Sequence, residues 1–264
     1  MSSTAFNLCN LPPWVIASHQ FNEHPQPLFI QGVREANRFL FKKLDGVDSR
    51  DERGQLFSDY LSVKFQLHHQ EGQTELARKS LRNSYLRFLK GWMMDSNSVE
   101  GAVLKGWVES RMGIGPTFHN GPIITSDCEA HYRYLLDRTR GSKRSNAINA
   151  QFDLLYEYCQ YELQRSHGEL GHLTLFRGTN GGTDDQVLER VGKREQVVRL
   201  NNLVSCTDEE ERAWEFGSLV WRVQVPLPKI FFFDELLPTS LLKGEGEYLV
   251  IGGDYRVVRV MCTV

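Results

Sequence analysis

The sequence predicts an α+β protein, with a mainly helical first part followed by a β-rich second part. Between residues 33 and 168, apolar side chains recur at helical spacing in several long segments. After Gly171 the chain changes to short β-prone runs separated by turn residues. Near the end, Gly252-Gly253-Asp254 lies between two such runs and is a hairpin signal. Helices and strands that are segregated along the chain are typical of the α+β class.

The first part opens with a proline-rich segment, residues 11–27, which we expect to be an ordered, extended arm. Its apolar side chains, Trp14 among them, are expected to bury against the body of the protein. Six helices are then expected at residues 35–44, 55–68, 75–94, 98–112, 128–138 and 146–165. Ser98 is a candidate N-cap for the fourth of these.

Residues 113–122 contain three glycines and two prolines, so they predict a loop and an internal boundary. This divides the chain into an N-terminal arm and helical region, residues 1–122, and a catalytic region, residues 123–264. In the β-rich part, strands are expected at residues 172–177, 197–205, 219–225, 230–233, 247–251 and 255–264. An acidic, helix-favouring stretch at residues 208–216 follows the second of them.

Composition excludes several classes of protein. The chain has 264 residues and a formal net charge of −2, which gives no reason to expect nucleic acid binding. No apolar run approaches the roughly 20 residues of a membrane span, and the N-terminus lacks the features of a secretory signal. The five cysteines are scattered and odd in number, which predicts reduced thiols and a cytoplasmic location. No histidines show metal-ligand spacing, so no metal site is predicted.

Three short motifs on or beside predicted strands are the candidate functional residues: Arg177-Gly178-Thr179, Ser205-Cys206-Thr207 and Glu245-Gly246-Glu247. Alternate residues of a strand point to the same face, so each motif offers two polar side chains together. Each motif is weak alone, because about four acidic-x-acidic pairs are expected by chance in such a chain. The order and strand context of all three carry the prediction.

This set suits cleavage of the nicotinamide–ribose bond of NAD. The planar guanidinium of Arg177 suits a diphosphate, and Gly178 allows close backbone approach to the nicotinamide carboxamide. Glu247 is predicted to stabilise the cation that develops on the ribose. Glu245 is predicted to orient an acceptor and take its proton. The alternative is that all three motifs have structural roles. Arg177 would then form an ion pair with a carboxylate, and the two glutamates would be exposed to solvent. The hydroxyls at the strand end would cap the next helix, as Thr207 is expected to do.

The Arg … Ser-x-Thr … Glu-x-Glu order resembles the R-S-E class of mono-ADP-ribosyltransferases. The resemblance implies a split β-sandwich NAD site with Arg177, Gly178, Thr179, Ser205 and Thr207 around the dinucleotide. It also implies arginine as the acceptor, with Phe216 either stacked on nicotinamide or placed in the core. The middle motif departs from the commoner Ser-Thr-Ser, which leaves the role of Thr207 open.

Over the whole chain, the sequence resembles the ADP-ribosyltransferases that act on dinitrogenase reductase in nitrogen-fixing bacteria. Residues 10–14, 113–116 and 175–180 carry this likeness. It implies modification of one arginine on the nitrogenase iron protein, which stops nitrogen fixation, and control through a PII signalling protein. The loop at residues 234–244 would select the acceptor, with Leu241 and Leu242 either docking on the target or lying in the core. The alternatives are an NAD glycohydrolase and a non-catalytic module that binds NAD or a partner.

Overall fold

The computed structural model describes residues 7–67, 84–143, 147–168, 171–181, 185–238 and 246–261. Helices and strands are segregated along the chain, so the predicted α+β class is confirmed at this level. The helices of the first part are α1 Pro13–Ile16, α2 His19–Glu23, α3 Val33–Ala36, α4 Arg38–Asp45, α5 Arg50–Lys64, α7 Tyr85–Met94, α8 Val99–Met112, α9 Glu129–Ser142 and α10 Ile148–His167. The second part contains β1 His172–Thr179, β2 Gln186–Arg190, β3 Glu195–Thr207, α11 Glu210–Ala213, β4 Leu219–Pro226, β5 Ile230–Phe233 and β6 Glu247–Arg259, with short 3-10 helices η1 Trp214–Phe216, η2 Leu227–Lys229 and η3 Asp234–Leu236.

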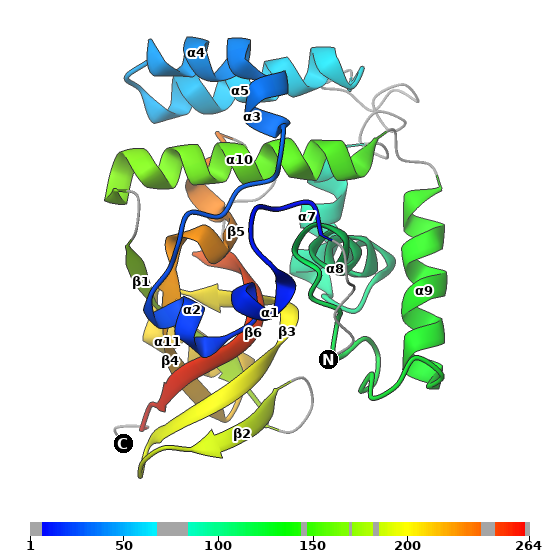
Figure 1. Ribbon diagram of the computed structural model, residues 1–264, viewed down its shortest axis with the longest axis vertical. Helices are drawn as coiled ribbons and strands as arrows, with labels where there is room; N and C mark the ends of the chain where they lie inside the picture. Colours follow the sequence, from blue (N-terminus) through cyan, green and yellow to red (C-terminus); the bar gives the residue numbers. More distant parts are fainter. Residues whose placement is uncertain are drawn as a thin grey trace.

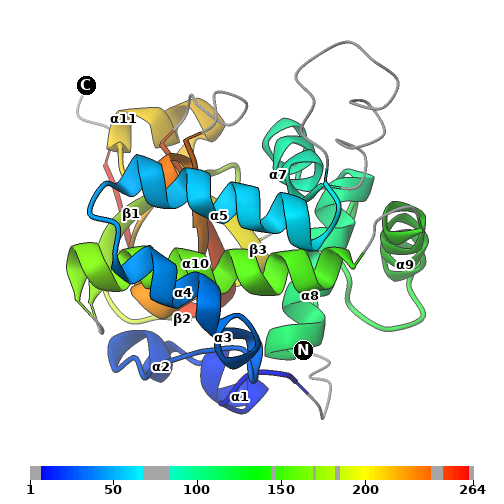
Figure 2. The ribbon, with the colours of Figure 1, turned by 90° about the horizontal axis from the view of Figure 1, so that it is seen from above.

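The long helix α10 joins the helical layer to the sheet. It packs on β5 on one side and on α3 and α5 on the other, as Figures 1 and 2 show. Phe231 of β5 lies beneath Trp107 of α8, with ring centroids 4.7 Å apart. On the far side, the buried pair of Arg53 and Glu162 ties α5 to α10, with nitrogen and oxygen 2.6 Å apart. Side chains from both predicted regions thus share one hydrophobic core, and the boundary near residue 122 stays a prediction.

The strands form one antiparallel sheet in the order β2-β3-β1-β4-β6-β5, with an additional pairing of β3 with β6. The longest ladders are β3 with β6 and β1 with β4. Two short ladders join them: the single pair Phe176–Thr207 between β1 and β3, and three pairs between β4 and β6. These pairings close β3, β1, β4 and β6 into a ring, so the ends of β1, β3 and β6 meet at one edge.

The hairpin predicted at Gly252-Gly253-Asp254 is wrong, because β6 continues through these residues and pairs with β3 on both sides of them. The ladder shifts register between Leu200 and Leu203 of β3. A Cβ on Gly252 would lie 1.7 Å from the Asn201 carbonyl oxygen, and Gly253 has a φ of +118°. The two glycines therefore permit a bulged crossing of two long strands.

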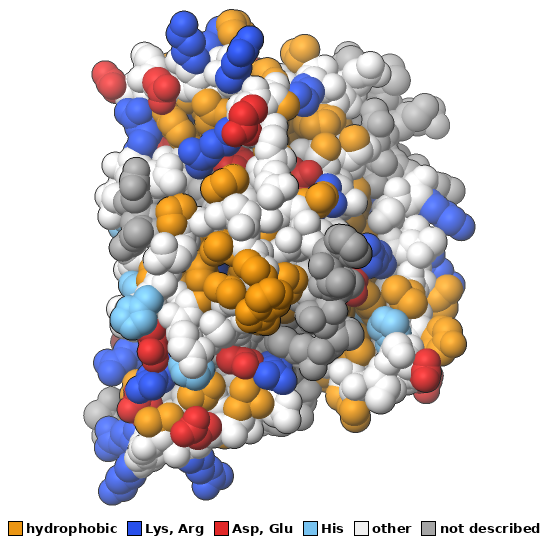
Figure 3. Space-filling model, viewed as in Figure 1, with side chains coloured by type: hydrophobic (Ala, Val, Ile, Leu, Met, Phe, Trp, Pro, Cys, Tyr) orange, Lys and Arg blue, Asp and Glu red, His pale blue; other side chains and the backbone are white. Residues whose placement is uncertain are grey.

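The proline-rich segment is not a fully extended arm, since it contains the short helices α1 and α2. Pro13 occupies the first position of α1, where a missing N–H costs nothing. Ser18 caps α2 by accepting a hydrogen bond from the Phe21 N–H. Phe21 and Ile16 are buried as expected, but Trp14 is 71% exposed. Figure 3, which is viewed from the same side as Figure 1, shows hydrophobic side chains gathered over α1.

The other predicted helices differ mainly at their ends. The helix expected at residues 35–44 is divided into α3 and α4 at Asn37, whose φ of −118° lies outside the helical range. Ser98 caps α8 as predicted, accepting a hydrogen bond from the Gly101 N–H at 3.1 Å. The first half of the helix expected at residues 75–94 lies outside the described residues. Within the described part of the chain, no helix is long and apolar enough to cross a membrane.

Candidate active site

The sheet register brings the three sequence motifs together. Thr207, the last residue of β3, pairs with Phe176 of β1 on one side and with Glu247 of β6 on the other. Arg177 follows Phe176, and Ser205 lies two residues before Thr207 on the same face of its strand. Three segments separated by up to 70 residues in sequence thus contribute adjacent side chains.

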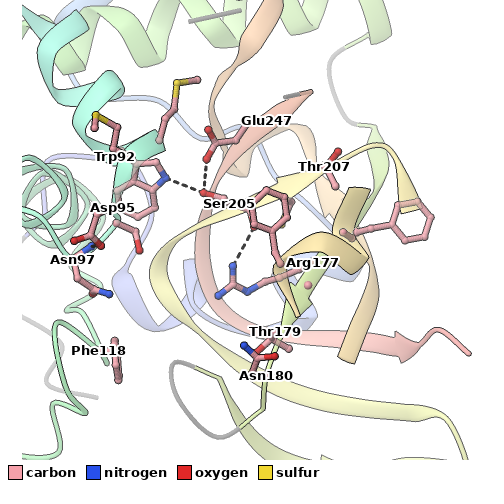
Figure 4. A pocket seen from close by; sticks show the side chains of 18 residues that line it. Trp92, Asp95, Asn97, Phe118, Arg177, Thr179, Asn180, Ser205, Thr207 and Glu247 are labelled. Atoms are coloured by element: carbon pink, nitrogen blue, oxygen red, sulfur yellow. Dashed lines mark hydrogen bonds between the residues drawn. The ribbon is translucent and has the colours of Figure 1, made fainter. Parts of the chain in front are cut away.

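These side chains line a cavity of about 530 Å³ between the sheet edge and the helical part of the protein. That volume lies within the usual range for sites that hold small molecules and cofactors. Figure 4 shows the labelled residues around the cavity. The residues predicted to form the site that line it are Arg177, Gly178, Thr179, Ser205, Thr207, Phe216 and Glu247.

Arg177 is held in place from two directions. Its Nη1 donates a hydrogen bond to the Ser205 carbonyl oxygen at 3.1 Å. Its Nε lies 3.4 Å from Oδ1 of Asp185, whose side chain is buried. These contacts fix the guanidinium at the cavity wall, where it can bind an anion. Arg177 also forms the ion pair that a purely structural role would require, so the two roles coexist in this residue.

Ser205 and Glu247 are joined directly, because the Ser205 hydroxyl donates a hydrogen bond to Oε1 of Glu247. The two residues are diagonal neighbours on one face of the β3–β6 ladder. Trp92 of α7 approaches the same hydroxyl from the helical part, and its Nε1–H donates to the Ser205 Oγ at 2.9 Å. Both hydrogen bonds are drawn in Figure 4.

The other members of the motifs have distinct surroundings. Thr179 is buried, and its Oγ1 accepts a hydrogen bond from the Gly181 N–H at 3.2 Å. The Thr207 hydroxyl accepts from the Glu209 N–H at 3.2 Å in a turn before α11, but Glu209 is the N-cap of that helix and no side chain caps it, so the expected capping role of Thr207 is wrong. Burial raises the pKa of the Cys206 thiol to about 12, although Arg177 beside it acts in the opposite direction. The thiol therefore stays protonated near neutral pH and is a poor nucleophile.

Phe216 lies at the end of η1, on the rim of the cavity. The sequence left a core position and a nicotinamide contact as alternatives for this ring. Its side chain is 55% exposed, so it is not part of the hydrophobic core. An exposed aromatic ring on the cavity rim offers a flat surface against which a planar ligand can stack.

Gly178 is required by packing, because α11 crosses β1 at this residue. A Cβ at position 178 would lie 1.9 Å from the Ala213 carbonyl oxygen and 3.1 Å from the Cβ of Phe216. The absence of a side chain at Gly178 therefore leaves room for α11. The close approach of the Gly178 backbone to a ligand remains a second, predicted reason for glycine at this position.

We expect Gly178→Ala to lower the free energy of unfolding by about 1–3 kcal/mol, because α11 must move away from the strand. The movement displaces Phe216, so the apparent affinity for a ligand in the cavity falls as well. Thermal unfolding and ligand titration measure the two effects. Gly192→Ala is the matched control, since a Cβ there meets only the Glu195 Cβ at 3.7 Å. Equal stability of the two variants would contradict this packing argument.

The remaining predicted residues lie outside the described part of the chain. Glu245 immediately precedes the described segment that begins at Gly246, which has a φ of +56°. Leu241 and Leu242 also lie outside it. The roles assigned to these three residues remain predictions from the sequence.

The opposite wall of the cavity comes from the helical part and was not predicted from the sequence. It is formed by residues at the C-terminal end of α7 and in the loops beside α8: Trp92, Met93, Met94, Asp95, Ser96, Asn97 and Phe118. Lys105 of α8 supports this wall, because its Nζ donates to the Asn97 Oδ1 and to the Phe118 carbonyl oxygen, both at 3.0 Å. The only signal in the sequence was a buried-looking tryptophan at helical spacing, which is more often a core residue.

A buried arginine on one strand, a serine on the next and a glutamate bound to that serine are the residue set of the R-S-E class of ADP-ribosyltransferases. The family model described as dinitrogenase reductase ADP-ribosyltransferase (DRAT) matches residues 6–259. The NAD(+)–dinitrogen-reductase ADP-D-ribosyltransferase of Rhodospirillum rubrum is 45% identical over 258 residues, which cover 95% of this chain and 93% of that protein. No solved structure matches the chain at a significant level. The chain belongs to the dinitrogenase reductase ADP-ribosyltransferase family.

Proposed function

We propose that this chain transfers the ADP-ribosyl group of NAD to an arginine of dinitrogenase reductase, the iron protein of nitrogenase, and thereby inactivates it. The observation that carries the proposal is the convergence of Arg177, Ser205 and Glu247 on one cavity. Membership of the family and the name of the Rhodospirillum rubrum relative supply the acceptor protein.

In the proposed reaction, the bond between the ribose C1′ and the nicotinamide nitrogen breaks, and its electron pair leaves with nicotinamide. Arg177 binds the diphosphate and Phe216 stacks on the nicotinamide. The Glu247 carboxylate stabilises the positive charge that develops on the ribose, in the manner of the carboxylates of glycosidases. A guanidinium nitrogen of the acceptor then attacks C1′ and loses a proton.

Glu245 is the group that we propose accepts this proton, because an arginine guanidinium is almost never neutral in water. We expect Glu245→Gln to lose transfer to arginine by roughly 10²-fold or more while slow hydrolysis of NAD continues. Nicotinamide release and label incorporation into protein, measured on the same sample, separate the two reactions. Normal modification of protein by this variant would show that Glu245 does not have this role.

The closed ring of β1, β3, β4 and β6 supports a split β-sandwich of the ADP-ribosyltransferase type, with the NAD site at the edge where the motifs meet. We propose that residues 1–122 form a platform for the acceptor and the regulator, and that residues 123–264 form the catalytic region. A PII signalling protein is the proposed regulator. Retention of dinitrogenase reductase or PII binding after deletion of residues 1–120 would refute this division.

The alternative functions differ in how nicotinamide release depends on the acceptor protein. We expect release to be slow with NAD alone and to rise when purified dinitrogenase reductase is added. An NAD glycohydrolase would release nicotinamide at the same rate with or without that protein. A non-catalytic binding module would release none under either condition, even with the regulator present.

A further inference from the structure

Trp92 connects the helical part of the protein to the catalytic sheet across the cavity. It lies near the end of α7, 113 residues before Ser205 in the sequence, and its side chain is 3% exposed. Its indole Nε1–H donates a hydrogen bond to the Ser205 Oγ at 2.9 Å. In Figure 4, Trp92 and Glu247 both reach Ser205, each by a hydrogen bond to its hydroxyl.

The donor and acceptor capacities of these groups fix the direction of the chain of hydrogen bonds. An indole N–H can only donate, and an ionised carboxylate can only accept. A serine hydroxyl has one hydrogen, which must point away from a group that donates to its oxygen. The Trp92 hydrogen bond therefore directs the Ser205 hydrogen toward Oε1 of Glu247, in agreement with the observed contact.

The position of the indole is itself fixed from the helical side. The ammonium of Lys105, which is buried in α8, lies 5.9 Å from the centre of the Trp92 ring. At the start of α7, the Tyr85 N–H donates to the Gln151 Oε1 of α10 at 2.9 Å. The α10 helix is in turn bound to the sheet, because Gln160 Nε2 donates to the Ile230 carbonyl oxygen of β5 at 2.8 Å. A continuous series of contacts thus runs from the sheet through α10 and α7 back to Ser205.

We propose that Trp92 is a positioning residue, which acts through the Ser205 hydroxyl to hold the Glu247 carboxylate at the place where the ribose cation develops. This inference rests on the proposed function, because it assigns Trp92 a part in the same reaction. Without the indole N–H, the hydroxyl can rotate and donate elsewhere, and the carboxylate loses a fixed partner. Trp92 thereby gives the helical part of the chain a share in catalysis in addition to its proposed role as a platform.

The test is a double-mutant cycle on Trp92→Phe and Ser205→Ala. We expect Trp92→Phe alone to lower kcat for nicotinamide release by about 5- to 20-fold, the effect of one lost hydrogen bond in the site. The Kd for NAD should change by less than about twofold, because phenylalanine keeps an aromatic ring in the cavity wall and removes only the N–H that donates to Ser205. In the Ser205→Ala background, Trp92→Phe should have no further effect on kcat.

Trp107→Phe is the matched control, because it also removes a buried indole hydrogen bond, from Nε1 to Oδ1 of Asp153 at 2.7 Å, but lies outside the cavity. It should lower the melting temperature while leaving kcat of the folded enzyme unchanged. If Trp92→Phe does not fold, benzothienylalanine at position 92 keeps the shape of the indole and lacks the N–H.

Three results would overturn the inference. The first is an unchanged kcat in both position-92 variants. The second is a loss that is equally large in the Ser205→Ala background. The third is a rise in the Kd for NAD that accounts for the whole effect. A wild-type protein that releases no nicotinamide under any condition would instead remove the proposed function on which the inference rests.

Discussion

Glu247→Gln is expected to lower the rates of both ADP-ribosyl transfer and NAD hydrolysis by roughly 10³-fold. The amide keeps the size of the side chain and can still accept the hydrogen bond from Ser205. It lacks the negative charge that stabilises the ribose cation, so the transition state loses more stabilisation than the ground state does. Single-turnover nicotinamide release measures the rate, and NAD titration should give a Kd within about threefold of the wild-type value.

Glu189→Gln is the matched control for this substitution. Glu189 is exposed on β2, outside the cavity, so its charge should not affect the reaction. A Glu247→Gln protein that retains one tenth of the wild-type rate would mean that another group stabilises the ribose cation. A variant that no longer binds NAD would assign Glu247 to ligand binding instead.

Arg177→Lys is expected to raise the KM for NAD by about 10- to 100-fold, even though the positive charge is kept. The guanidinium binds the Ser205 carbonyl oxygen and the Asp185 carboxylate while facing the cavity. A single ammonium group cannot reproduce this fork of donors. Because Asp185 is buried, its carboxylate would also lose part of its compensation, and the melting temperature should fall.

Binding of NAD and of ADP-ribose, measured directly, separates the effect on affinity from the effect on stability. Arg222→Lys serves as control, because Arg222 is an exposed residue of β4 that does not line this cavity. Unchanged affinity for both ligands in Arg177→Lys would place the diphosphate elsewhere and leave Arg177 with the structural role of an ion pair.

Local sequence signals predicted the strands that contain a run of apolar residues. Strand β5, with four consecutive apolar residues that are all buried, has the bounds expected from the sequence. Strand β2 was not predicted, because every one of its residues is exposed and it therefore shows no alternation of buried and exposed positions. It is held by pairing with β3, which no local pattern reveals.

The hairpin error has a related cause. Paired glycines beside an aspartate are the usual residues of a tight turn, but they also suit a bulge where two strands approach closely. The decisive contact is between Gly252 and Asn201, 51 positions apart in the chain. Only the pairing of β3 with β6 distinguishes the two outcomes.

For the candidate site, the order of the motifs predicted one wall of the cavity and not the other. Residues two positions apart on a strand lie on the same face, so a shared face can be predicted from spacing alone, as for Ser205 and Thr207. Trp92 and Asp95 lie in and after a helix and meet the strands only through the packing of α7 and α8. Their part in the site depends on tertiary contacts, which the spacing of residues in the sequence does not encode.

The central claim is that this chain modifies an arginine of dinitrogenase reductase with the ADP-ribosyl group of NAD. The most direct test is incubation with labelled NAD and an extract of nitrogen-fixing cells, followed by gel electrophoresis and mass spectrometry of the labelled band. We predict one labelled protein, dinitrogenase reductase, that carries ADP-ribose on an arginine and is absent when Glu247→Gln replaces the wild-type enzyme. Release of nicotinamide without any labelled protein, or label on a residue other than arginine, would contradict the claim.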